Sequence, residues 1–100
     1  MDRPLNNVTV RVGGRAQFHC RATGIPQPEF SWYKNNQYLI QDTGTFVIRS
    51  YAWGSRLTVK NIDIIDEGTV KCSASNDAGR VESIAILSVD ASIVSTQTER

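Results

Sequence analysis

The sequence predicts an all-β domain built from two antiparallel sheets that pack face to face. Apolar and polar residues alternate over residues 15–22, where Ala16, Phe18 and Cys20 share one side. The same alternation recurs around Cys72. A period of two places alternate side chains on opposite faces of a strand, so each segment reads as a strand with one buried face. Two such strands, each with a cysteine on its buried side, indicate two sheets around one core.

Trp32 lies between the two cysteines, 12 residues after Cys20 and 40 before Cys72. This Cys–Trp–Cys spacing resembles that of the immunoglobulin sandwich. The resemblance implies a disulfide between Cys20 and Cys72 with Trp32 packed against it. A zinc site needs about four ligands, and His19 alone cannot complete such a set. A disulfide implies an oxidising compartment, whereas a cytosolic domain of this fold would keep both thiols reduced.

The N-terminal half supplies the first strands. Residues 5–12 follow Pro4 and carry valines at positions 8, 10 and 12, which favours an edge strand because proline cannot donate to a sheet. Residues 23–28 include two prolines and are expected to carry the chain from one sheet to the other. Residues 29–34 form the next strand, with Trp32 on its inward side.

A tight turn follows at Asn35 and Asn36, which tolerate the positive φ that such turns require. Residues 38–40 then continue as a short strand. Only 24 residues separate Trp32 from Leu57, too few for the two additional strands of an antibody variable domain. The sandwich is therefore expected to be of the compact intermediate type, the I-set.

Two more strands are expected over residues 46–49 and 56–60, joined by a loop over residues 50–55. In the second of these strands Leu57 points inward, and we place it in the core with Trp32.

Two aromatic residues, Tyr51 and Trp53, lie in this loop, where turn residues alone would connect the strands. Tyrosine and tryptophan are enriched in interfaces because they offer large contact area at small entropic cost. We hypothesise that at least one of them is mostly exposed and contacts a neighbouring domain or partner. The alternative is that one ring folds back over the open end of the core.

The C-terminal part supplies two strands and a linker. The immunoglobulin family carries a tyrosine two residues before the second cysteine, but Val70 stands there, so the hydrogen bond that anchors this corner is expected to be missing. Residues 72–79 read CSASNDAG and resemble the turn into the last strand of I-set domains. Residues 80–90 form that strand, but neither alternate set of side chains is wholly polar, so the side facing the core stays open. We assign residues 1–90 to the domain and residues 91–100 to a flexible linker.

Composition excludes several function classes. The net charge is +1 and the basic residues are spread along the chain, so neither nucleic acid nor a membrane surface is an expected partner. No nucleophile elbow or glycine-rich phosphate loop is present, so no enzyme activity and no cofactor are expected. No metal site is expected either, because the acidic residues near the end of the chain lack the dense spacing of a calcium loop. They are Asp63, Asp66, Glu67 and Asp77.

Asn7 begins the tripeptide Asn7-Val8-Thr9, an acceptor sequence for N-glycosylation. A glycan is chemically reasonable on the exposed edge of a secreted protein. Such tripeptides also arise by chance, so glycosylation of Asn7 is a prediction that depends on the compartment.

Several short segments resemble the immunoglobulin-like domain of the receptor tyrosine kinase-like orphan receptors. They are PLNNVT at 4–9, FHCR at 18–21, PQP at 26–28, WYKN at 32–35, and RS at 49–50 followed by GSRL at 54–57. The resemblance implies a single-pass plasma-membrane receptor that responds to Wnt ligands, with this extracellular domain ahead of a Frizzled-like cysteine-rich domain and a kringle. The fragment would then serve protein recognition or spacing.

Two other readings of the function stay open. The domain could belong to a cell-adhesion molecule and bind another immunoglobulin domain. It could also be an intracellular sarcomeric or cytoskeletal module, which predicts reduced cysteines and an unused glycosylation sequence.

Overall fold

The computed structural model describes residues 5–39 and 45–90. These two ranges contain the strands β1 Val8–Arg11, β2 Ala16–Arg21, β3 Glu29–Lys34, β4 Gln37–Tyr38, β5 Phe46–Tyr51, β6 Gly54–Val59, β7 Gly68–Asn76 and β8 Gly79–Asp90, and the 3-10 helix η1 Ile64–Asp66. No helix within them is long and apolar enough to cross a membrane. The linker predicted over residues 91–100 lies outside the described residues and stays a prediction.

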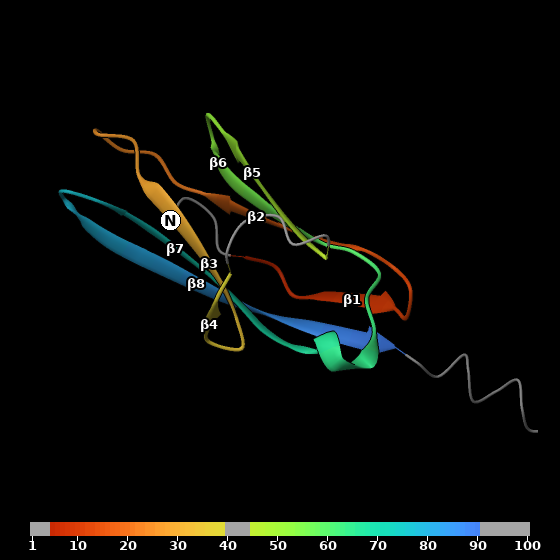
Figure 1. Cartoon of the computed structure of the whole chain (residues 1–100). Coiled ribbons are helices and arrows are strands. Elements are labelled where there is room, and N and C mark those ends of the chain that lie inside the picture. The colour runs from red at the N-terminus through yellow and green to blue at the C-terminus, as the bar shows by residue number, and fades with distance from the viewer. Residues whose placement is uncertain (1–4, 40–44, 91–100) are drawn as a thin grey trace, which may run out of the picture.

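The strands form two layers. A five-stranded sheet has the order β1-β8-β7-β3-β4, and a three-stranded sheet has the order β2-β6-β5. Figure 1 shows β2, β5 and β6 stacked over the larger sheet. The predicted sandwich is confirmed with one correction, because β1 pairs with β8 in parallel, Val8 opposite Leu87. The chain reverses after β1 at Gly13, whose φ is +87°, and then enters the other sheet as β2.

The core lies between the sheets and is joined by one covalent bond. Cys20 on β2 and Cys72 on β7 form a disulfide with their Cα atoms 6.3 Å apart, and both residues are fully buried. The predicted core residues Trp32 and Leu57 are 1% and 0% exposed. The larger side chains that complete this cluster are Phe18, Val59, Ile62, Val70 and Leu87. The two sheets are therefore held as one body by the bond and by the apolar layer around it.

The hairpin between β5 and β6 is tighter than predicted. β5 continues to Tyr51 and β6 begins at Gly54, so the loop expected over residues 50–55 shrinks to a two-residue turn. Gly54 has a φ of +148°, and a Cβ at this position would overlap the carbonyl oxygen of Cys20. Only glycine lets β6 approach β2 this closely, and the sequence pattern alone does not show that contact.

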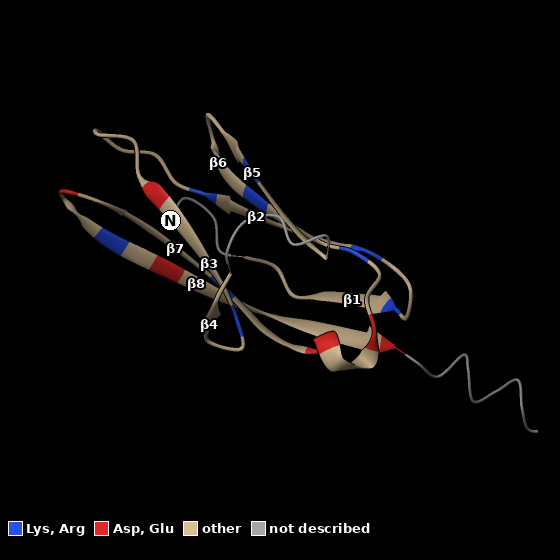
Figure 2. Cartoon of the chain, viewed as in Figure 1, with Lys and Arg blue, Asp and Glu red and all other residues tan. Residues whose placement is uncertain are grey.

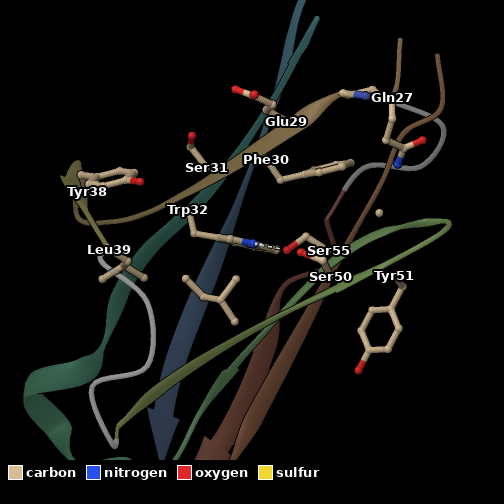
Figure 3. Close-up of a pocket in the computed structure, with 13 residues that line it drawn as sticks. Gln27, Glu29, Phe30, Ser31, Trp32, Tyr38, Leu39, Ser50, Tyr51 and Ser55 are labelled. Carbon is tan, nitrogen blue, oxygen red and sulfur yellow. Dashed lines mark hydrogen bonds between the residues drawn. The ribbon is translucent and has the colours of Figure 1, made fainter. Parts of the chain in front are cut away.

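This correction places Ser55 inside the core rather than in a loop. Ser55 is fully buried, and its Oγ accepts a hydrogen bond of 2.9 Å from Nε1 of Trp32, as the dashed line in Figure 3 shows. Its hydroxyl in turn donates to the carbonyl oxygen of Arg49 at 3.3 Å. A buried indole N–H needs an acceptor, so Ser55 allows Trp32 to occupy the centre of the sandwich.

The structure decides which side of β8 faces the core. Ala85 and Leu87 are 1% and 0% exposed, whereas Ile84 and Ile86 are 61% and 46% exposed. Ala85 lies opposite Val70 on β7, and Val70 is also fully buried. The position where the family has a tyrosine therefore carries a core side chain here.

The corner before β7 has hydrogen bonds of its own despite the missing tyrosine. Asp63 caps η1 by accepting from the backbone N–H of Ile64 at 2.7 Å, and Asp66 accepts from the N–H of Asp63 at 2.8 Å. Glu67 accepts from the N–H of Val89 at 3.1 Å, which ties the corner to β8. Asp63 and Asp66 thus cap η1, and Glu67 links the corner to the last strand.

The predicted turn between β3 and β4 is confirmed. Asn35 and Asn36 have φ values of +51° and +67°. Asn35 also exchanges two hydrogen bonds of 2.9 Å with Thr69, one through its N–H and one through Oδ1, and so fastens the turn to β7. β4 ends at Tyr38, and Ile40 of the predicted strand lies outside the described residues.

Candidate interaction surface

Tyr51 and Trp53 lie on the outer side of the three-stranded sheet. Their rings stack with centroids 4.8 Å apart and planes only 6° from parallel. The backbone carbonyl of Trp53 accepts from the N–H of Ala22 at 3.3 Å, which holds the turn against the end of β2. Figure 3 shows the Tyr51 ring on the other side of β5 and β6 from Trp32. The stacked pair is therefore separated from the core by the sheet itself.

The two alternatives considered for these rings both need correction. Tyr51 is 36% exposed and Trp53 is partly buried, so neither ring is mostly exposed. Neither belongs to the core cluster, so neither covers its open end. The rings shield one another and are covered further by charged side chains. Their role as an interface stays a proposal.

Cationic side chains enclose the stacked rings. The guanidinium carbon of Arg21 lies 4.6 Å from the ring centroid of Trp53, and that of Arg56 lies 5.2 Å from the centroid of Tyr51. The imidazole of His19 is 5.6 Å from Trp53 at an angle of 44°. Each guanidinium is attracted to the negative face of an aromatic ring. The result is a layered arrangement of cation, indole, phenol and cation.

Sheet register brings further positive charge into this area. His19 on β2 pairs with Arg56 on β6, and Arg56 pairs with Arg49 on β5. We call this outer side of the three-stranded sheet the basic face. Its residues are His19, Arg21, Arg49, Tyr51, Trp53 and Arg56.

Strands β2, β5 and β6 contain three arginines and no acidic residue. Figure 2 shows this as blue segments without red along these strands, whereas red segments lie on β3, β8 and η1. Burial, followed by the charges of Arg21 and Arg56, lowers the pKa of His19 below its usual 6.5. The basic residues are spread along the sequence, but pairing between strands gathers some of them on one side of the sheet.

The side chain of Arg56 is partly buried. Its Nε is buried and has no hydrogen-bond partner among the described residues. Arg49, by comparison, donates from Nη1 to the carbonyl oxygen of Ile48 at 3.1 Å. A buried donor without an acceptor is unusual in folded proteins and calls for an explanation.

The outer side of the larger sheet has a different character, and we call it the five-stranded face. Nζ of Lys71 lies 3.9 Å from Oε2 of Glu82 and 4.6 Å from the ring centroid of Tyr33. Nε of Arg80 lies 3.8 Å from the same oxygen of Glu82. The exposed Ile84 and Ile86 lie beside these groups. The residues of this face are Tyr33, Lys71, Arg80, Glu82, Ile84 and Ile86. Its charges have partners of opposite sign, and its apolar side chains face solvent.

Asn7 is exposed and lies just before β1. Its Oδ1 accepts a hydrogen bond of 2.9 Å from the N–H of Ile86. A glycan attaches to Nδ2, the other atom of the carboxamide. The predicted modification is thus sterically reasonable and stays a prediction.

The other predicted features do not form a chemical site. Within the described ranges no three metal-ligating side chains come together. A hollow of about 390 Å³ opens between β3 and β5, with Phe30, Trp32 and Ser55 in its wall (Figure 3). It adjoins Leu39, the last described residue before the gap at 40–44. No nucleophile and base are paired among its lining residues.

To find the cations of the basic face from the sequence, one would have to know which residues of neighbouring strands are paired. The alternation of residues 15–22 already places His19 and Arg21 on the polar side. What identifies the basic face is that the paired strands also place Arg49 and Arg56 outward, and this depends on register.

A family model of the immunoglobulin I-set domain matches residues 1–89. Human vascular endothelial growth factor receptor 1 is 34% identical over 87 residues, 87% of this chain and 6% of that receptor. Vascular endothelial growth factor receptor 3 of Danio rerio is 37% identical over 93 residues, 93% of this chain and 7% of the receptor. The chain thus spans a small fraction of these relatives.

Solved structures show the same fold. Titin domain M7 has a TM-score of 0.84 at 30% identity, covering 89% of this chain and 90% of that one. A titin A168–A169 fragment has a TM-score of 0.84 at 28% identity, covering 88% of this chain and 46% of that one. The chain is therefore a non-catalytic domain of the immunoglobulin I-set family.

Proposed function

We propose that the chain is an extracellular recognition and spacing module of a single-pass receptor, and that it makes contact through the basic face. The observation that carries the proposal is the Tyr51–Trp53 stack outside the core. The fold does not need these rings for its interior, which Trp32 already fills. Large aromatic side chains on a sheet surface, held by neighbouring cations, are suited to binding another molecule.

The disulfide and the relatives support an extracellular location. The Cys20–Cys72 bond is stable in an oxidising compartment. The vascular endothelial growth factor receptors similar to this chain are receptors by name. The likeness to titin domains supports the second candidate, an intracellular structural module, because the fold is shared by both classes.

The narrower identification with the receptor tyrosine kinase-like orphan receptors, and with Wnt signalling, rests on the short segments described above. A Frizzled-like cysteine-rich segment after residue 100 of the parent chain would support it. A further Cys–Trp–Cys set in that position would favour a receptor with several immunoglobulin domains or an adhesion molecule.

Surface staining tests the location directly. An antibody against this domain is applied to intact and to permeabilised cells that express the parent protein. We expect staining of intact cells. Staining that requires permeabilisation would reject the extracellular role and favour the intracellular module.

Glycosylation of Asn7 gives a second test of the compartment. We expect peptide mapping of the secreted protein to find a glycan at Asn7 and to lose it in Thr9→Ala. This variant removes the acceptor sequence but keeps the hydrogen bond from Ile86 to Asn7. An unmodified Asn7 in protein from the secretory route would remove this support.

A further inference from the structure

We propose that the basic face binds an extended sulfated polysaccharide through Arg21 and Arg56, with His19 beside them. The inference deepens the proposed extracellular role, because such chains occur outside the cell. It names the partner by its charge and shape. Four observations on the described residues lead to it.

The first observation is a pair of like charges on neighbouring strands, with a histidine beside it. Arg56 lies between Arg49 and the imidazole of His19 in the register of the sheet. Like charges directly opposite one another weaken strand pairing. Strands β2, β5 and β6 themselves contain no acidic residue. An anion bound beside Arg56 would lower this repulsion, so the arrangement favours an anionic ligand.

The second observation is the position of the Arg56 guanidinium, which lies over the ring of Tyr51. Its Nε is buried, so a ligand from solvent can meet only the outer edge of the group. A guanidinium presents its N–H groups in a planar fork that matches two oxygens of one anionic group. A sulfate at the outer edge of Arg56 would add charge-assisted hydrogen bonds to a side chain that already lies in place.

The third observation is that the rings hold the arginines in position. Arg21 lies over Trp53 and Arg56 over Tyr51, while the two rings stack on each other. The ring faces are thus occupied within the protein, and the charged groups are left to contact the ligand. Fixing both arginines before binding reduces the entropy lost when a ligand arrives.

The fourth observation distinguishes a polysaccharide from an acidic peptide. Protein partners are usually anchored by an apolar side chain in a desolvated pocket. Here the rings of Tyr51 and Trp53 are covered by each other and by Arg21 and Arg56. The other outward positions of the three strands are polar or glycine, except the half-buried Val47 on β5. The cations also spread over neighbouring strands about 4.8 Å apart, which suits repeated charges along a chain.

The binding test uses the 100-residue chain and a heparin-derived dodecasaccharide, followed by isothermal titration calorimetry. We expect saturable binding that weakens about tenfold between 50 and 200 mM salt, as two or three released counterions require. The double variant Arg21→Gln/Arg56→Gln should lose at least about tenfold in affinity, on the same counterion argument. The matched control Lys71→Gln/Arg80→Gln removes the same charge from the five-stranded face and should change affinity less than about twofold.

A measurement on the unchanged protein guards against a variant that fails to fold. The indole N–H resonances of the two tryptophans are recorded during titration. That of Trp53 should shift, whereas that of Trp32, bonded to Ser55 in the core, should not. The pKa of His19 should rise when the polysaccharide binds.

Three results would overturn the inference: no saturable binding, equal losses for the two double variants, or equal competition by a polyglutamate peptide of the same charge. The last would favour an acidic protein partner. Failure of the binding inference can be told apart from failure of the proposed extracellular location. Surface staining can reject the extracellular location while the oligosaccharide still binds. It can also confirm that location while the oligosaccharide does not bind.

Discussion

The two outer faces of the sandwich handle charge differently. On the five-stranded face Glu82 lies between Lys71 and Arg80, so charges of opposite sign are neighbours. On the basic face Arg56 lies between His19 and Arg49, and aromatic rings are the nearest stabilising groups. Exposed pairs of opposite charge contribute little to stability but remove repulsion. The five-stranded face therefore has ion pairs of its own, whereas the strands of the basic face contain no acidic residue.

The β5–β6 and β7–β8 hairpins differ in how closely their glycines pack against the rest of the domain. Gly54 in the β5–β6 hairpin touches β2, because a Cβ there would overlap the carbonyl of Cys20. Gly79 in the β7–β8 hairpin has a φ of +152° but nothing within 4 Å of a built Cβ. One turn is packed against a neighbouring strand and the other is open. The hairpin beside the basic face thus makes a close backbone contact with β2, and the β7–β8 hairpin makes no such contact at Gly79.

A large loss of stability is expected when the disulfide that joins the two sheets is removed. Removing the disulfide with Cys20→Ala/Cys72→Ala frees a loop of sequence separation 52 in the unfolded chain. The chain-entropy model gives a loss of about 4 kcal/mol in the free energy of unfolding. Urea denaturation of the oxidised protein and the double variant measures it. A loss below about 1 kcal/mol would show that the apolar layer alone joins the sheets.

The next effect separates the two hairpins. Gly54→Ala should lower the free energy of unfolding by at least about 3 kcal/mol, because strain at positive φ adds to a backbone overlap. Gly79→Ala has the same φ strain without the overlap and should cost only about 1–2 kcal/mol. Thermal melting of both variants provides the comparison. Equal losses would contradict the close approach of β6 to β2.

The surface Trp53 is expected to contribute less to stability than the buried Trp32. Trp53→Ala removes one stacking contact and one cation–π contact, so we expect a loss of about 1–2 kcal/mol. Trp32→Ala should cost about 3–5 kcal/mol, as large-to-small changes in cores do. Chemical denaturation measures both. If Trp53→Ala were as costly as Trp32→Ala, the stacked pair would belong to the core rather than to the surface.

The smallest effect concerns His19. Its pKa in the folded protein lies below 6.5, first because of burial and then because of Arg21 and Arg56. The folded state therefore binds protons less readily than the unfolded chain. The stability contributed by His19 is complete above pH 6.5 and is lost as the pH falls through the lower folded-state pKa.

Nuclear magnetic resonance titration checks this assignment. Arg21→Gln should raise the pKa of His19, because it removes one of the charges that lower it. Arg80→Gln, on the other sheet, should leave the pKa unchanged. The same shift in both variants would mean that net charge, not the basic face, sets the protonation of His19.

The sequence by itself determined the architecture. Period-two alternation places Cys20, Trp32, Leu57 and Cys72 inside, because only one face of each strand can be buried. Asn35 and Asn36 predicted a tight turn because their side chains tolerate positive φ. These features are local, so a pattern of neighbouring residues is enough to reveal them.

Tertiary structure alone decided the surface and the ambiguous strand. β8 has apolar residues on both sides, and its pairing with β7 places Ala85 opposite the buried Val70, so Ala85 and Leu87 face the core. Gly54, which ends the β5–β6 turn, contacts β2, a strand more than 30 residues earlier. The basic face exists because register aligns cations from three strands. Charge adds up through space, and residue order alone does not show which side chains lie together.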